Sequence, residues 1–150
     1  MNISEHMTSE HKRCDLLYLE AEKAVLDGDW ERSRQQYHLF YQSMIQHFEQ
    51  EETVLFPDFE QVQGSEMGPT QVMRMEHEQM LGLMENIQKA LDLEDKDGFL
   101  AEADTLLVFM QQHNAKEEMM LYPMSDQLLA PQSAEIICRM QAVVEKQAAS

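Results

Sequence analysis

The chain has 150 residues, with 11 Lys and Arg against 28 Asp and Glu, which gives a formal net charge of −17. This length suits one domain with a single core, so we expect residues 1–150 to form one domain. A chain this acidic repels phosphate backbones and anionic lipid, and we therefore expect no nucleic acid and no membrane among its partners.

Other features of the composition bear on where the protein works. The N-terminus has neither a basic start nor an apolar run, and apolar runs such as Leu106–Met110 are too short to span a bilayer. Cys14 and Cys138 are isolated, which fits free thiols in a reducing compartment. We therefore expect a cytoplasmic protein.

The first half of the chain predicts two helices separated by a short turn. Residues 4–26 have helical periodicity, Gly28 ends the pattern, and Asp29 is a plausible N-cap for the next helix. That second helix is expected to begin at Trp30 and to end near Phe56, because a residue before proline avoids the α region. The apolar members of the first helix are Leu16, Leu17, Leu19 and Val25, and the second is expected to bury Phe40, Met44 and Phe48.

The second half predicts two more long helices and a short one. Pro69 suits the first turn of a third helix, after a connection over residues 57–68. A polar turn at residues 93–98 leads to a fourth helix over residues 99–121, which Pro123 is expected to stop. No stretch alternates with period two. The sequence thus predicts an all-α protein, an up-down-up-down four-helix bundle over about residues 4–124, with a short additional C-terminal helix over about residues 131–147.

One motif occurs twice in the chain, sixty-six residues apart. It reads H-x-x-x-E-E-x-x-L-[F/Y]-P and begins at His47 and again at His113. In a helix, His47 and Glu51 project from one face, and His113 and Glu117 do the same. An imidazole beside a carboxylate is a pair of ligands that suits a transition metal, and two such pairs suggest two metal ions.

The same offset places Glu10-His11 on Glu76-His77, so the chain reads as two copies of one helical hairpin. Residues equidistant from a turn lie level in antiparallel helices, which puts His11, His47, His77 and His113 in one layer. Buried polar groups are costly without partners, and metal coordination removes that cost. His6 and His38 lie outside the repeat and are interpreted as ordinary histidines.

The ligand types narrow the choice of metal. Six ligands would crowd one ion, whereas two ions bridged by two carboxylates form a familiar arrangement for iron or manganese, and zinc needs fewer ligands. The order His-x-x-x-Glu differs from the Glu-x-x-His of ferritin-like sites and is richer in imidazole. It favours a histidine-rich di-iron centre over ferroxidase chemistry.

With these residues, the chain resembles the hemerythrin-like, or HHE cation-binding, domains over about residues 10–124. The resemblance implies a non-haem site of two iron ions in a four-helix bundle, bridged by carboxylates and an oxo or hydroxo group. By position, the implied terminal ligands are His11, His47, His77 and His113, and Glu51 is one implied bridge. Oxygen carriers of the family place the second bridging acid at the position of Glu118, whereas the internal repeat favours Glu117.

One departure from the family pattern affects the expected activity. The oxygen carriers have a histidine four residues after the third-helix ligand, where this chain has Leu81. An open coordination position there favours redox chemistry, sensing, or the handling of a small ligand such as dioxygen, nitric oxide or peroxide. The alternatives are a non-catalytic iron-binding or sensing module that acts through a protein partner, and an iron-centre repair protein. Whether the protein is an enzyme stays open.

Overall fold

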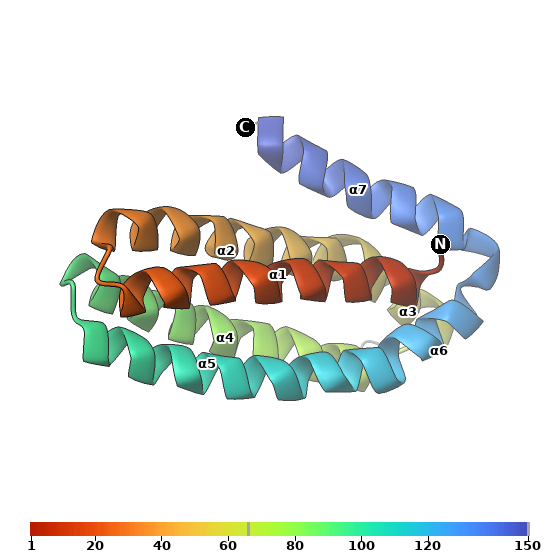
Figure 1. Ribbon diagram of the computed structural model, residues 1–150. Helices are drawn as coiled ribbons and strands as arrows, with labels where there is room; N and C mark the ends of the chain where they lie inside the picture. The colour runs from red at the N-terminus through yellow and green to blue at the C-terminus, as the bar shows by residue number, and fades with distance from the viewer. Residues whose placement is uncertain (66, 150) are drawn as a thin grey trace.

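The computed structural model describes residues 1–65 and 67–149, and within them it contains only helices, turns and short loops (Figure 1). Four long helices lie side by side: α1 (Ile3–Leu26), α2 (Trp30–Gln50), α4 (Pro69–Asp92) and α5 (Lys96–Lys116). α1 packs on α2, α4 packs on α5, and the two pairs pack on each other. The all-α expectation is confirmed. In the described residues, no helix is long and apolar enough to cross a membrane.

Short polar side chains cap the N-termini of α1, α2 and α5. Asn2 accepts a hydrogen bond from the backbone N–H of Glu5, and Asp29 accepts one from that of Arg32. Asp95 accepts one from Gly98, so α5 begins at Lys96, three residues earlier than expected. Pro69 stands in the first turn of α4, where a missing N–H costs nothing. The expected cap at Asp29 and the expected start at Pro69 are therefore confirmed.

The expected helix ends at Phe56 and before Pro123 are wrong. α2 continues through a π-helical turn, η1 (Glu51–Leu55), into α3 (Phe56–Gln63). α5 likewise continues through η2 (Glu117–Leu121) into α6 (Tyr122–Leu128). In a regular helix a proline lacks the N–H for the carbonyl four residues back and clashes with it. The π turn removes this conflict, because the backbone N–H groups of Phe56 and Tyr122 bond to residues five back, Glu51 and Glu117.

The π turns also reorient the aromatic residues that follow them. In a regular helix of 3.6 residues per turn, a residue nine positions along points about half a turn away from the first. Phe56 and Tyr122 stand nine positions after His47 and His113, and would therefore face away from them. A π turn inserts about one residue, which rotates both rings back by about 100°. Both side chains are fully buried.

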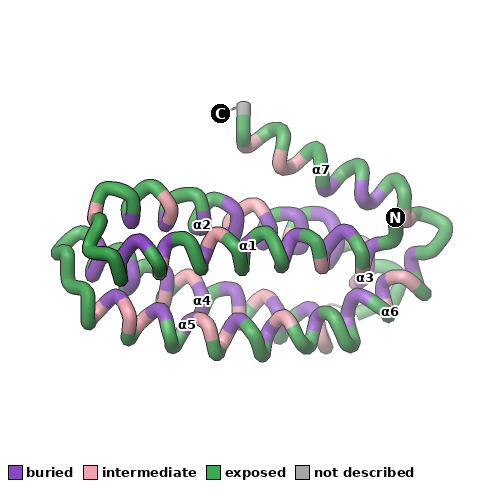
Figure 2. The backbone as a smooth tube through the Cα atoms, in the orientation of Figure 1, coloured by how far each residue is buried: buried purple, intermediate pink, exposed green. Residues whose placement is uncertain are grey.

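The apolar core is divided into two clusters. Figure 2 marks the buried residues along the long helices. The larger lies between the long helices and includes Phe40, Met44, Phe48 and Met84. The smaller gathers at the end of the bundle where α3 and α6 lie, and includes Ile3, Met7, Phe56 and Tyr122. Along each long helix, together with the π turn that follows α2 and α5, buried polar residues stand between residues of the two clusters.

The C-terminal helix covers the smaller cluster. α7 (Ser133–Ala149) follows a 3-10 turn, η3 (Ala130–Gln132), and contributes Ile136, Ile137 and Met140 to that cluster. It packs against α2, α1 and η1, crossing over the α1–α2 side of the bundle in Figure 1. The expected short C-terminal helix is thus present and starts at Ser133.

Two of the leucines named as apolar members of the first helix lie on its outer side. Leu16 is 65% exposed and Leu19 is 54% exposed. The buried stripe of α1 instead follows a spacing of three and four residues that includes polar members: Met7, His11, Cys14, Tyr18, Ala21 and Val25. Reading leucines alone misplaces the face because a histidine and a tyrosine belong to it.

Replacing Leu106 with Ala should lower the free energy of unfolding by about 2–5 kcal/mol. Leu106 is fully buried in the larger cluster, and the truncation leaves a cavity there. Urea unfolding of the metal-free protein measures this loss. Leu16→Ala makes the same chemical change at an exposed position, and it should change stability by no more than about 0.5 kcal/mol. Equal losses in the two variants would contradict the described core.

Candidate metal centre

The structure brings together all six residues that the sequence marked as candidate metal ligands. His11, His47, His77 and His113 and the two glutamates, Glu51 and Glu117, are all buried, with exposed fractions of 4% or less. They come from α1, α2, α4, α5 and the first residues of the two π turns. The four histidines therefore form a layer, as the distances from the turns predicted.

The donor atoms form two groups that share one carboxylate. Ligand atoms of Glu51, His77, His113 and Glu117 lie within 4.8 Å of one another, and so do those of His11, His47 and Glu117. Glu117 Oε1 is 3.1 Å from His11 Nε2 and 3.3 Å from His113 Nε2. Glu51 Oε1 is 3.0 Å from His77 Nε2 and 3.4 Å from His47 Nε2.

Several of these atoms have no hydrogen-bond partner within the described residues. They are His47 Nδ1, His77 Nε2, His113 Nε2, Glu51 Oε1 and Glu117 Oε2. A buried polar atom without a partner costs on the order of 1–3 kcal/mol. His47 faces the cluster with Nε2, so its Nδ1 is not satisfied from there. For the other four atoms, the cost is removed if a cation occupies the space toward which the imidazole nitrogens and carboxylate oxygens converge. The cluster fits a metal site.

Carboxylates outside the cluster hold three of the four imidazoles by the opposite nitrogen. His77 Nδ1–H donates to Glu52 at 2.9 Å, His11 Nδ1–H donates to Glu118 at 2.6 Å, and His113 Nδ1–H donates to Glu76 at 2.9 Å. A carboxylate can only accept, so Nδ1 keeps its hydrogen and Nε2 turns its lone pair to the centre. Outer partners of this kind are typical of histidines that bind metals.

Two of these outer contacts cross between the hairpins. Glu52 belongs to the first hairpin and holds His77 of the second, whereas Glu118 belongs to the second and holds His11 of the first. Glu52 and Glu118 occupy the same position in the repeat. The role of Glu76 was not predicted. Its repeat partner Glu10 precedes His11 as Glu76 precedes His77, but it contacts Gln50 and Arg13 and not a histidine of the cluster.

Aromatic rings fix the orientation of His77. Phe48 stacks on its ring with centroids 4.0 Å apart and an interplanar angle of 18°, and Phe56 stacks at 5.8 Å. The guanidinium of Arg74 lies 5.3 Å from the centroid of Phe56. The imidazole therefore has little freedom to turn away from the centre.

Tyr122 is a member of the cluster that the sequence reasoning missed. Its hydroxyl donates to Glu51 Oε2 at 2.7 Å and lies 3.1 Å from His11 Nε2. Burial raises the pKa of the Tyr122 hydroxyl well above its usual value, and the negative charges of Glu117 and Glu51 raise it further. The [F/Y] position of the repeated motif was the signal that could have pointed to it.

The charges in the cluster are strongly linked. Burial raises the pKa of Glu51, and the neighbouring charge of Glu117 raises it further. Burial opposes the charge on Glu117, but hydrogen bonding with Glu51 and the positive charge of His113 outweigh it, so the Glu117 pKa falls well below its usual range. Burial lowers the pKa of His11 and of His77, but hydrogen bonds to carboxylates outweigh this effect and raise both to about 9. Without a cation, protons on the histidines supply the positive charge.

The other buried or outlying candidates lie outside this centre. His6 is buried and its Nε2 contacts Gln50 Oε1 at 2.9 Å, while His38 is exposed. Cys14 is buried with Sγ 3.2 Å from Ser43 Oγ, and burial raises its thiol pKa to about 11. Leu81 is partly buried against the larger core cluster.

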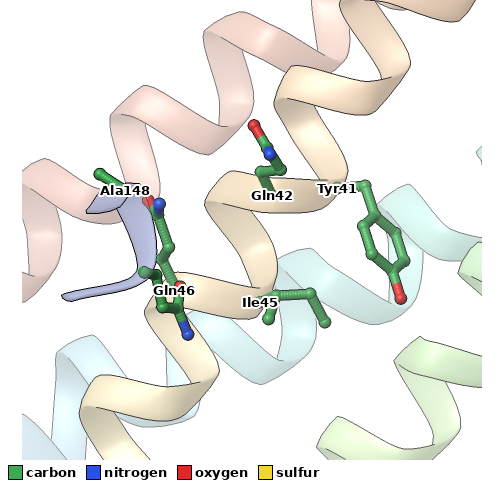
Figure 3. A pocket seen from close by; sticks show the side chains of 6 residues that line it. Tyr41, Gln42, Ile45, Gln46 and Ala148 are labelled. Carbon is green, nitrogen blue, oxygen red and sulfur yellow. The ribbon is translucent and has the colours of Figure 1, made fainter. Parts of the chain in front are cut away.

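The described surface pockets are not formed by these residues. One of about 450 Å³ lies between α2 and the end of α7 (Figure 3). Its lining consists of Tyr41, Gln42, Ile45, Gln46, Gln147 and Ala148. None of these is a carboxylate, a histidine or a cysteine, so the pocket offers no comparable set of metal ligands.

Comparison with known proteins gives one finding that covers most of the chain. A family model described as the hemerythrin HHE cation binding domain matches residues 2–125. Neither the search of curated proteins nor that of solved structures gave a significant match.

The metal-free protein should lose stability as the pH rises from about 6.5 to about 9. His11 and His77 have folded-state pKa values near 9 against an ordinary value of 6.5, so their contribution is full below pH 6.5 and is lost as the pH rises through about 9. Urea unfolding with a chelator present measures this slope. The exposed variant His38→Gln should show the same slope, and a free energy of unfolding that stays constant or rises over this window would contradict the prediction.

Proposed function

Since the chain belongs to the hemerythrin HHE cation-binding family, we propose that it is a non-haem di-iron protein that binds, senses or reduces a small molecule such as dioxygen, nitric oxide or peroxide. The up-down-up-down order of the four long helices is part of this proposal. The packing of α1 on α2 and of α4 on α5 supports it.

One observation carries the proposal: two convergent groups of buried ligand atoms share Glu117. A single ion would need one group, whereas two groups joined by a carboxylate are the arrangement of a two-metal centre. We assign His11 and His47 to one ion, His77, His113 and Glu51 to the other, and Glu117 to the position between the two ions. Imidazole and carboxylate ligands together suit iron.

The surrounding residues would prepare the centre for a small ligand. Glu52, Glu118 and Glu76 hold the imidazoles so that each Nε2 faces inward. The two apolar clusters lie on either side of the polar layer and exclude bulk water from it. Bound iron would supply electrons and coordination sites for the small molecule. The protein's own part is to fix the ligands and to keep the site dry.

Leu81 favours a ligand-handling role over a saturated structural site. It stands one helical turn after His77 and packs against the larger core cluster. A leucine has no donor atom, so the ion beside His77 and His113 would keep a coordination position for a small molecule. Structural metal sites fill all their positions with protein ligands, whereas reactive sites keep one open.

Glu117→Ala should lose at least one iron per chain, whereas Glu118→Ala should retain both. Glu117 contributes to both groups of ligand atoms, whereas Glu118 contacts only the outer nitrogen of His11. Loss of an outer partner typically weakens metal binding by about 10–100-fold without removing a ligand. Iron per chain after identical reconstitution measures both effects. If Glu118→Ala loses the metal while Glu117→Ala keeps it, the assignment of Glu117 between the two ions is wrong.

Mixing the anaerobic, ferrous protein with oxygenated buffer tests the small-molecule role. We expect visible absorption to develop and oxygen to disappear from solution in proportion to the bound iron. Glu117→Ala, reconstituted in the same way, should show at most a small part of this response. Wild-type protein that holds two ferrous ions and does not react with dioxygen, nitric oxide or peroxide would contradict the proposed function while leaving the metal centre intact.

A further inference from the structure

The two halves of the repeat differ by one hydroxyl group at the metal centre. Phe56 and Tyr122 are equivalent positions, and both rings are fully buried. Each packs against a histidine of the other hairpin: Phe56 lies 5.8 Å from the ring of His77, and Tyr122 lies 5.6 Å from that of His11. Phenylalanine would fill the space at position 122 equally well. The extra oxygen therefore needs its own explanation.

That oxygen stands beside the smaller group of ligand atoms. The group at His77 and His113 has four members, because Glu51 and Glu117 both belong to it, whereas the group at His11 and His47 has only Glu117 in addition. The Tyr122 hydroxyl is 3.1 Å from His11 Nε2, on the side of the three-membered group. It fills the position that would otherwise lack a fourth donor.

The distances around His11 Nε2 also match those expected around a shared cation. His11 Nε2 lies 3.1 Å from each of three atoms, His47 Nε2, Glu117 Oε1 and the Tyr122 oxygen. In neutral His11, the hydrogen is on Nδ1, which faces Glu118, so Nε2 presents a lone pair. The Tyr122 hydrogen is directed to Glu51 and the Glu117 carboxylate has none, so in this neutral state the lone pairs of His11 Nε2, Glu117 Oε1 and the Tyr122 oxygen face each other; a proton on His11 or a cation removes the conflict.

A cation resolves this arrangement. Two ligand atoms that are each about 2.1 Å from one ion lie roughly 3.0–3.4 Å apart in tetrahedral or octahedral geometry. The three separations of 3.1 Å from His11 Nε2 fall in this range, whereas His47 Nε2 and Glu117 Oε1 lie 3.9 Å apart. An oxygen donor also suits a ferric ion, which prefers hard ligands.

We propose that the phenol oxygen of Tyr122 is the fourth protein ligand of the metal position formed by His11, His47 and Glu117. This inference rests on the proposed metal centre. On coordination, the O–H bond breaks, an oxygen–metal bond forms, and the proton leaves to solvent, as happens with other ligands that bind in their deprotonated form. The two metal positions are then chemically different, one with a phenolate ligand and one without.

Tyr122→Phe tests this assignment, because Phe56 shows that phenylalanine fits the equivalent place in the fold. Wild-type protein reconstituted with iron and oxidised should show a visible phenolate-to-ferric charge-transfer band, with tyrosine ring vibrations enhanced in its resonance Raman spectrum. The variant should lose both signals. It should also release one of its two irons to a chelator at least about tenfold faster than the wild type.

Tyr37→Phe is the matched control. Tyr37 is also buried, and its hydroxyl donates to the backbone carbonyl of Met84 at 2.6 Å. Both residues belong to the larger apolar cluster and neither is a member of the metal centre. Removing it deletes a buried tyrosine hydroxyl without touching the centre, so the charge-transfer band and the iron release rate should stay at wild-type values.

The possible outcomes separate the two proposals. Wild-type protein that holds two ferric ions without a phenolate band overturns the role of Tyr122 and leaves the proposed function standing. Wild-type protein that binds no iron overturns both. The spectrum of the wild type decides the question even if Tyr122→Phe fails to fold.

Discussion

The structure depends on the need for positive charge in a dry layer that holds two carboxylates and four imidazoles. Glu51 and Glu117 are fully buried, and burial opposes the charge on both. The centre can meet this need with protons on its histidines or with metal ions. The raised pKa values of His11 and His77 reflect the first solution, and the convergence of unpaired donor atoms favours the second. The fold keeps both solutions available because its two apolar clusters lie on either side of the layer.

Much of this arrangement could be predicted from the sequence because the chain repeats itself. The sixty-six-residue offset and the turn positions were enough to bring His11, His47, His77 and His113 into one layer, since helix rise is nearly constant. The i, i+4 spacing placed Glu51 and Glu117 on the inner face for the same reason. Those inferences need only local geometry, and the structure brings these residues together.

The rest could not be predicted because it depends on backbone irregularity and on contacts between distant segments. A proline read locally ends a helix, but Pro57 and Pro123 each follow a π turn that lets the helix continue. That turn rotates Tyr122 into the centre, and a regular helix would direct it away. The hydrogen-bond partners of the Nδ1 atoms of His11 and His77 could not be predicted either. Glu52 meets His77 and Glu118 meets His11 only after the two hairpins dock. The leucines of the first helix did not indicate its buried face, because single exposed leucines are common on protein surfaces.

The crossed contacts between the hairpins make neither half a complete site. Glu52 of the first hairpin orients His77 of the second. Glu118 of the second hairpin orients His11 of the first. An isolated half would bring two histidines and one inner glutamate, with one outer carboxylate left without its imidazole. Docking of the two hairpins therefore completes the site, and a metal bound there would stabilise the docked arrangement further. The duplicated hairpin behaves like two subunits of a symmetric dimer that happen to share one chain.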